Sequence, residues 1–267
     1  MPTPLTASTS TNALYTDLSA YYDLMCLDID YASQSQCVAR LHQLFGNQGR
    51  LHLDLACGSG PHIRHFLDQG FSSRGLDLNQ PMLDLARKRC PEAQFDCQDM
   101  CSFSLDQGQD LITCFLYSLH YSGETTKLQA CIQQVHQALN SGGLFCFNSV
   151  DKGQIDNHSF ARHSVQQPDS ELTFTSGWYY RGEGDRQSLR LSIHKQSGEE
   201  QQHWQDEHPM VATSFTEMTT LLSPYFDVQL FEHDYQRLLP WQGQTGNAIF
   251  VCIKRDVALS PNASLPC

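Results

Sequence analysis

The chain has 267 residues, of which 40% are hydrophobic, so it can bury one substantial core with a smaller appended layer. Its formal net charge is −12 and its basic residues form no long cluster, which argues against a nucleic-acid partner because such proteins usually present a basic surface. No run approaches about 18 consecutive apolar residues, and the N-terminal segment lacks the pattern of a signal peptide. We therefore expect no membrane partner and a cytoplasmic protein.

The 11 cysteines are spread over the chain, and several lie in apolar, strand-like runs. This distribution favours reduced, buried side chains over a disulfide framework. His62 and His65 have a spacing that metal ligands can use, but no third ligand accompanies them, so we expect no metal site.

Residues 1–12 are rich in Ser, Thr and Pro and are expected to form a disordered tail. From Tyr15 onward the apolar residues recur at helical spacing, which predicts two helices before residue 46. Their apolar faces comprise Leu18, Tyr21, Tyr22 and Met25, and then Val38, Leu41, Leu44 and Phe45.

Residues 51–66 read LHLDLACGSGPHIRHF and predict a strand, a tight glycine turn and a helix. Gly58 and Gly60 allow backbone angles that other residues avoid, and the free N–H groups of a helix start attract polar or anionic ligand groups. A dinucleotide fingerprint needs a third glycine where Ile63 stands, so NAD is disfavoured. The next strand ends in Asp77, an acid that can accept hydrogen bonds from ribose hydroxyls.

Strands and helices then alternate, which predicts a doubly wound parallel sheet. The expected elements are a helix at 80–89 capped by Asn79, strands at 93–98 and 110–116, a helix at 127–139 and a strand at 144–150.

Between residues 151 and 211 the helical periodicity disappears, and turn sequences separate strand-like pieces. We expect an inserted antiparallel layer there, in which aromatic side chains such as Trp178 and Trp204 serve sheet packing or a dimer contact. The expected elements are strands at 171–180, 187–196 and 201–211, a helix at 214–222, strands at 226–232 and 247–254, and a disordered tail at 256–267.

Five segments of the chain resemble the motifs of the class I S-adenosylmethionine-dependent methyltransferases. In chain order they read LDLACGSG, GLDLNQPMLDLAR, CQDM, DLITCFLYSLHYS and GGLFCFNSV. The resemblance implies an α/β fold with a doubly wound, Rossmann-like, seven-stranded sheet and an antiparallel β layer inserted after strand five. It also implies one methyltransferase domain over residues 13–255, with the insert at 151–211.

The resemblance further implies S-adenosylmethionine as the cofactor. In such enzymes the glycine turn approaches the methionyl carboxylate, an acid at the place of Asp77 takes the ribose hydroxyls, and Asp99 with Met100 would border the adenine. Asp54 is expected to orient the amino group. The full expected set is Tyr22, Asp54, Ala56, Gly58, Gly60, Asp77, Leu78, Met82, Asp99, Met100 and Phe115.

The acceptor side is expected just past strand four, in a segment that resembles amino-sugar N-methyltransferases and glycine N-methyltransferase. An ungapped match puts Tyr121 at the place of a family histidine, with His120 one residue before it. His120 is a candidate base, with a structural role as the alternative, and Tyr121 is a candidate for orienting the acceptor. Tyr22, in preference to Tyr21 or Tyr31, is the third catalytic candidate, and packing of that aromatic face on the core is its alternative.

The sequence thus predicts transfer of a methyl group to a small-molecule acceptor, at an amine nitrogen. The alternatives are O-methylation of a hydroxyl or carboxylate, and a catalytically silent module that only binds the cofactor. Methyl transfer mainly requires a close, aligned acceptor and exclusion of water. We expect the insert to act as a lid or as the surface of a homodimer.

Overall fold

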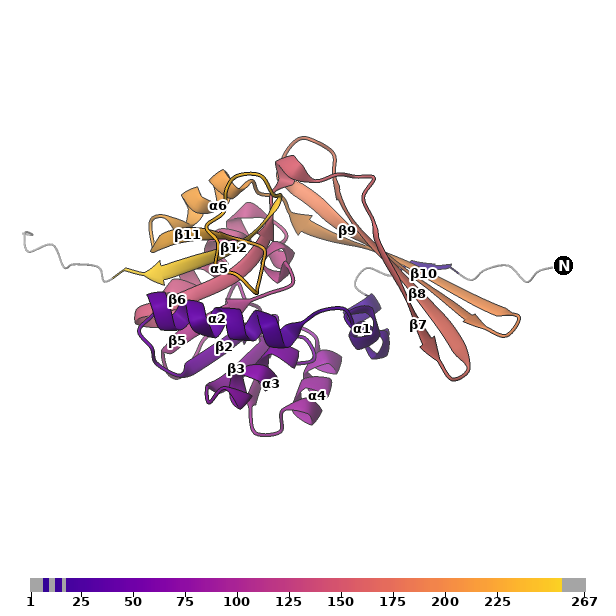
Figure 1. Cartoon of the computed structure of the whole chain (residues 1–267), viewed down its shortest axis with the longest axis horizontal. Coiled ribbons are helices and arrows are strands. Elements are labelled where there is room, and N and C mark those ends of the chain that lie inside the picture. The colour runs from indigo at the N-terminus through magenta and orange to yellow at the C-terminus, as the bar shows by residue number, and fades with distance from the viewer. Residues whose placement is uncertain (1–6, 10–12, 16–17, 256–267) are drawn as a thin grey trace, which may run out of the picture.

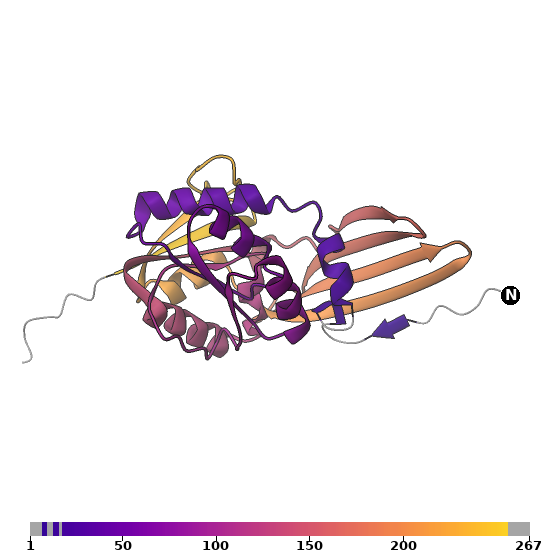
Figure 2. The same ribbon diagram turned by 90° about the horizontal axis from the view of Figure 1, so that it is seen from below.

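The computed structural model describes residues 7–9, 13–15 and 18–255 of the chain. It shows a helix-flanked sheet and a second, long-stranded sheet that projects from it, with the short helix α1 (Ser19–Met25) between the two (Figures 1 and 2). The expectation of disorder at 1–6, 10–12 and 256–267 concerns residues outside the described ranges. No helix within those ranges is both long and apolar enough to cross a bilayer.

The first sheet has seven strands in the order β11-β12-β6-β5-β2-β3-β4. The strand β12 runs antiparallel to both neighbours, and the remaining pairs are parallel. This confirms the predicted doubly wound sheet, and its order reverses beside β2, where such sheets bind ligands. The strands are β2 Leu51–Leu55, β3 Ser72–Asp77, β4 Gln94–Cys97, β5 Gln109–Cys114, β6 Leu139–Val150, β11 Phe226–Glu232 and β12 Asn247–Lys254.

Helices cover both faces of this sheet, so its central strands β2 and β5 are almost wholly buried. On one face, Ile132 of α5 and Met218 of α6 are fully buried in one hydrophobic cluster with the strands, and on the other face Leu41 of α2 and Phe66 of α3 are fully buried in another. The helices are α2 Tyr31–Phe45, α3 Pro61–Asp68, α4 Gln80–Arg89, α5 Thr125–Ala138 and α6 Phe215–Leu222.

The second sheet confirms the antiparallel insert after the fifth strand of the first sheet. Its order is β1-β10-β9-β8-β7, and the short strand β1 joins its edge in parallel with β10. One face buries Leu172, Phe174, Leu191 and Ile193 against the N-terminal segment, including Leu14 and the apolar side chains of α1. The strands are β1 Ala7–Thr9, β7 Ala161–Gln167, β8 Ser170–Tyr180, β9 Arg186–Ser197 and β10 Glu200–Val211.

Several expectations need correction. The strand β7 was not predicted, because ARHSVQQ contains a single large apolar residue, Val165. Residues 7–9 form the edge strand β1 instead of part of a disordered tail. The strand β6 begins at Leu139, directly after α5, and not at residue 144 as expected. Asn79 occupies the N-cap position of α4, but its side chain donates to Asp77 instead of capping the helix.

Candidate active site

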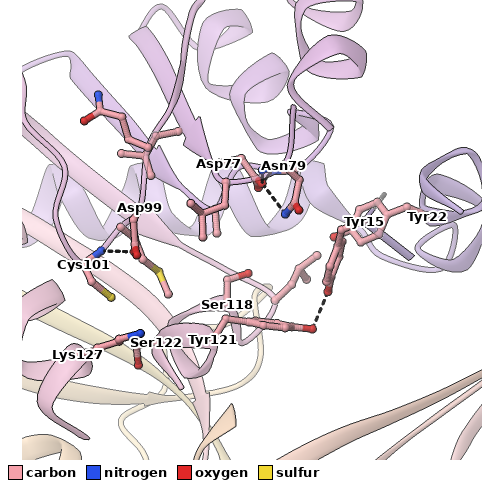
Figure 3. Close-up of a pocket in the computed structure, with 17 residues that line it drawn as sticks. Tyr15, Tyr22, Asp77, Asn79, Asp99, Cys101, Ser118, Tyr121, Ser122 and Lys127 are labelled. Atoms are coloured by element: carbon pink, nitrogen blue, oxygen red, sulfur yellow. Dashed lines mark hydrogen bonds between the residues drawn. The ribbon is translucent and has the colours of Figure 1, made fainter. Parts of the chain in front are cut away.

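A cavity of about 280 Å³ lies at the carboxyl ends of β2, β3, β4 and β5, at the order reversal of the sheet (Figure 3). The N-terminal elements η1 (Ala13–Tyr15) and α1 contribute Tyr15 and Tyr22 to its wall, and the turn η2 (Ser118–Ser122) contributes Tyr121. The size and place are typical of a small-molecule site in an open α/β sheet.

The glycine turn and Asp77 form one hydrogen-bonded unit in this wall. Gly58 has a φ of 55° and Gly60 a φ of 79°, which favours glycine at both places. The Asp77 carboxylate accepts from the Gly58 N–H at 2.9 Å and from the Asn79 N–H at 2.8 Å. Burial raises the pKa of Asp77, and these hydrogen bonds oppose the rise. The site therefore holds a fixed acceptor at the place expected for the ribose.

The next part of the wall fits a flat heterocycle. Asp99 accepts from the Cys101 N–H at 2.8 Å, which fixes its carboxylate at the end of β4. Met100 is 7% exposed and supplies an apolar surface, and Leu78 lies at the outer rim with 62% of its surface exposed. All four residues line the cavity, as an adenine site requires.

A smaller cavity adjoins the first and contains Asp54. Tyr22, Tyr31 and Phe115 also line it. The Thr113 hydroxyl donates to Asp54 at 2.6 Å, and burial raises the pKa of Asp54 to about 7. A buried acid at this place suits a cationic amino group, because the cation would restore its ionised form.

The helix α1 is held over the glycine turn by charged groups. Asp23 of α1 accepts from the Ser59 hydroxyl at 2.6 Å and pairs with Arg89 of α4 at 2.6 Å. Arg89 also donates to the Ser59 carbonyl at 2.6 Å. As a result Tyr22 points into the cavity, whereas Tyr21 packs on Trp204 of the insert.

His120 is fully buried and does not line either cavity. Its Nδ1 lies 2.9 Å from the Val211 carbonyl oxygen, and its Nε2 lies 2.9 Å from the Ser149 hydroxyl. Trp178 packs edge-on against its ring. Burial lowers the pKa of His120 to about 4. These contacts fit the structural alternative for His120.

Tyr121, in contrast, lies in the cavity wall and faces Tyr15 (Figure 3). The two hydroxyl oxygens are 2.7 Å apart. Behind Tyr121, its hydroxyl lies 2.5 Å from Nδ1 of His208, a residue of β10. This part of the cavity wall is therefore built from two phenols, with a buried histidine in contact with Tyr121.

Comparison with known proteins supports the resemblance found in the sequence. A sequence profile described as "Methyltransferase domain" matches residues 53–143, the region that carries the glycine turn, Asp77 and Asp99. Over this region the chain resembles the class I S-adenosylmethionine-dependent methyltransferases. The chain is also 32% identical over 130 residues to the dTDP-3-amino-3,4,6-trideoxy-alpha-D-glucopyranose N,N-dimethyltransferase of Streptomyces venezuelae, covering 48% of this chain and 55% of the relative. The chain thus spans about half the length of the curated relatives it matches.

Solved methyltransferase structures share the whole fold, insert included. A sugar N-methyltransferase from Streptoalloteichus superposes with a TM-score of 0.79 at 19% identity, over 96% of this chain and 99% of that one. An amino pentose methyltransferase from Micromonospora echinaspora, solved with S-adenosylmethionine bound, gives a TM-score of 0.74 at 18% identity, over 90% of this chain and 97% of that one. At such identities the likeness establishes the methyltransferase fold.

The structure gathers most of the sequence-predicted site residues at one place. Those in the main cavity wall are Tyr22, Ala56, Gly58, Asp77, Leu78, Asp99, Met100 and Tyr121. Asp54 and Phe115 line the adjoining cavity, whereas Gly60, Met82 and His120 line neither. Met82 is fully buried beneath the turn, so it supports Gly58 from below rather than bordering the cavity.

Other residues of the methyltransferase site were not singled out from the sequence. Tyr15 and His208 are the main ones, and Asn79, Ser118 and Lys127 also face the cavity or support its wall. Asn79 lies just after the end of β3, and Ser118 lies in the segment after β5. A position just past a parallel strand is a signal that the sequence could have offered. His208 stands in a strand far along the chain and carries no local motif.

Replacing Asp54 with Asn should stabilise the unliganded protein near pH 8. Because burial raises the pKa of Asp54 to about 7, the folded state resists ionisation that the unfolded chain undergoes near pH 4. The resulting penalty grows between these two values, so the gain in Tm should be absent at pH 4 and largest at pH 8. At about 2–4 °C per kcal/mol it is readily measured by differential scanning calorimetry.

The matched control is Asp84→Asn, because Asp84 is an exposed acid of α4 paired with Arg87. It should leave the pH dependence of Tm unchanged. The Asp54→Asn protein should also bind S-adenosylmethionine about tenfold more weakly, since one hydrogen bond to a charged group is lost. Equal Tm values for wild type and Asp54→Asn at pH 8 would show that this acid carries no buried charge.

Proposed function

We propose that the protein transfers a methyl group from S-adenosylmethionine to an amine nitrogen of a small molecule, and that this molecule is an amino sugar. When bound, the cofactor supplies an electrophilic methyl group on a sulfonium. Asp77 would hold its ribose, Asp99 and Met100 its adenine, and Asp54 its amino group. The carboxylate that Gly58 and Asn79 orient toward the cavity supports this arrangement.

The distribution of charge in the cavity wall supports an amine as the methyl acceptor. Asp77 and Asp99 supply acids, and Lys127 is the one basic side chain among the described residues of that wall. Lys127 lies beside Cys101 and Ser122, on the side away from Tyr15 (Figure 3). A carboxylate acceptor near the phenols would thus lack a cationic partner, whereas an amine is compatible with neutral hydroxyls and nearby acids.

The choice of an amino sugar rests on the relatives, three of which are N,N-dimethyltransferases of dTDP-linked amino sugars. To test the proposal, the purified protein is incubated with S-adenosylmethionine and dTDP-linked sugars that carry an amine at C3 or C4. Matched sugars with a hydroxyl in place of the amine, glycine and trans-aconitate serve as comparison acceptors. Mass spectrometry should show one or two added methyl groups on the amino sugars alone.

Methylation of the hydroxyl sugars or of trans-aconitate would show that the methyl group goes to an oxygen and not to an amine nitrogen. Binding of S-adenosylhomocysteine without turnover of any acceptor would favour the silent module. We also infer that residues 13–255 act as one unit in the cytoplasm, with the insert as a lid, because its apolar face packs on α1. Whether the insert also joins two copies is tested by light scattering.

A further inference from the structure

Four side chains form a continuous hydrogen-bonded row from the cavity into the insert. The Tyr15 and Tyr121 hydroxyl oxygens are 2.7 Å apart, and the Tyr121 hydroxyl lies 2.5 Å from His208 Nδ1. On the far side of the ring, His208 Nε2 lies 2.9 Å from a carboxylate oxygen of Asp206. The row joins η1, η2 and β10, so it connects the cavity wall to the second sheet.

The donors and acceptors of this row can be assigned by elimination. An ionised Asp206 only accepts, so His208 carries its proton on Nε2 and leaves Nδ1 as an acceptor. Tyr121 must then donate to Nδ1, and the oxygen of Tyr121 accepts from the Tyr15 hydroxyl. A second lone pair of the Tyr121 oxygen remains for a donor in the cavity. The row is therefore oriented to take a proton from the cavity toward β10.

The surroundings of His208 contain few other charges. Its side chain is fully buried, with the rings of Tyr15 and Tyr121 at 5.2 and 5.6 Å, and it lies opposite the apolar Leu189 of β9. The neighbouring pair Arg190 and Glu207 belongs to the other face of the sheet, since successive side chains alternate. Besides burial, Cys26, which directly follows α1, and Asp77 of β3 raise the pKa of Tyr15.

These surroundings suit a proton acceptor that starts neutral. Burial lowers the pKa of His208, and Asp206 opposes that shift by stabilising the imidazolium. Burial also raises the pKa of Tyr121 well above its usual value, so a phenolate is not the resting form. Tyr121 can therefore pass a proton on, but it is a poor place to hold the negative charge.

We propose that His208, supported by Asp206, accepts the proton of the acceptor ammonium through the hydroxyl of Tyr121. The ammonium N–H proton goes to the Tyr121 oxygen while the Tyr121 proton goes to His208 Nδ1, which leaves a neutral amine and an imidazolium paired with Asp206. The amine lone pair then bonds to the methyl carbon, the carbon–sulfur bond breaks, and its electron pair stays on sulfur as a thioether. His208 returns its proton to water after product leaves. This proposal rests on the proposed amine N-methylation.

The first test is His208→Asn, because the Asn amide oxygen can still accept from Tyr121 but takes up no proton. With a dTDP-linked amino sugar as acceptor, kcat should fall about 10²- to 10⁴-fold near pH 6, the usual range for general acid–base catalysis. The loss should shrink as pH rises, because the free amine then enters already neutral. Asp206→Asn should give a smaller loss with the same pH trend, while S-adenosylhomocysteine affinity should stay at the wild-type value.

His203→Asn is the matched control, since His203 lies on the same strand and faces His194 instead of the cavity. It should leave kcat unchanged at every pH. A His208→Asn protein with the wild-type pH profile, or one whose defect lies in KM alone and is equal at every pH, would reduce His208 to a structural contact and overturn the relay.

A second measurement needs no acceptor and separates the relay from the proposed function. Nitrogen-15 NMR of the protein saturated with S-adenosylhomocysteine, with His208→Asn used to assign the ring, should show a neutral imidazole protonated on Nε2. Tyr121→Phe should shift the Nδ1 resonance. A proton on Nδ1 would overturn the relay even in an active amine methyltransferase. No turnover of any amine would overturn the proposed function, and with it the use of the relay in catalysis.

Discussion

Asp77→Asn is expected to weaken S-adenosylhomocysteine binding by about 10- to 150-fold. The carboxylate of Asp77 accepts hydrogen bonds from the N–H groups of Gly58 and Asn79, one on each oxygen. In the Asn variant an NH₂ group replaces one of these oxygens, and it cannot accept a hydrogen bond. Hydrogen bonds to charged groups contribute about 1.5–3 kcal/mol, and each 1.4 kcal/mol is about a factor of ten in affinity. The loss should therefore combine a missing ribose contact with a disturbed turn.

Isothermal titration calorimetry of S-adenosylhomocysteine into wild type, Asp77→Asn and Asp84→Asn measures this effect. The surface variant Asp84→Asn should bind as wild type does, since its carboxylate is exposed on α4. NAD serves as the negative ligand because Ile63 replaces the third glycine of a dinucleotide fingerprint. An unchanged dissociation constant for Asp77→Asn would mean that Asp77 makes no contribution to cofactor binding.

His120→Ala should lower the Tm by at least about 4 °C while sparing cofactor binding. The change removes the hydrogen-bond partner of the Val211 carbonyl and of the Ser149 hydroxyl in a fully buried place, and it leaves a void beside Trp178. Each buried polar group without a partner costs about 1–3 kcal/mol, and each kcal/mol corresponds to about 2–4 °C for a domain of this size. Thermal unfolding followed by circular dichroism measures the shift.

Turnover at a temperature well below both Tm values completes this test. It should remain near wild type in His120→Ala and fall in Tyr121→Phe, because Tyr121 lines the cavity and His120 does not. His158→Ala, at an exposed position, provides the stability control. Loss of turnover in His120→Ala without loss of stability would return the role of base to His120.

The cofactor half of the site could be predicted because its signals are local. Asp77 ends β3, and Gly58 and Asp99 lie within a few residues of the ends of β2 and β4. The carboxyl ends of such parallel strands meet at one edge of the sheet. The side chain of Asp77 contacts residues within the same short motifs, namely Gly58 and Asn79. Strand order and strand ends were therefore sufficient to place these three residues.

The acceptor half depends on contacts that no local pattern encodes. His120 and Tyr121 are neighbours in the chain, but His120 turns to Val211 and Tyr121 turns to His208, both on β10. The backbone path of η2 beside the second sheet decides which of these two residues faces the cavity. Spacing in the sequence shows the period of a strand but not which of its two faces packs on another element.

The two contacts that β10 makes with η2 also bear on how such an enzyme could be re-engineered. The Val211 carbonyl at the end of β10 accepts from His120, and His208, three residues earlier, contacts Tyr121. The same strand pairs with β9 and so continues into the insert. The insert therefore cannot be exchanged independently of the domain that carries the cofactor site. Transplanting a foreign insert would need a matching η2, so acceptor range is better altered by single side chains facing the cavity than by grafting the sheet.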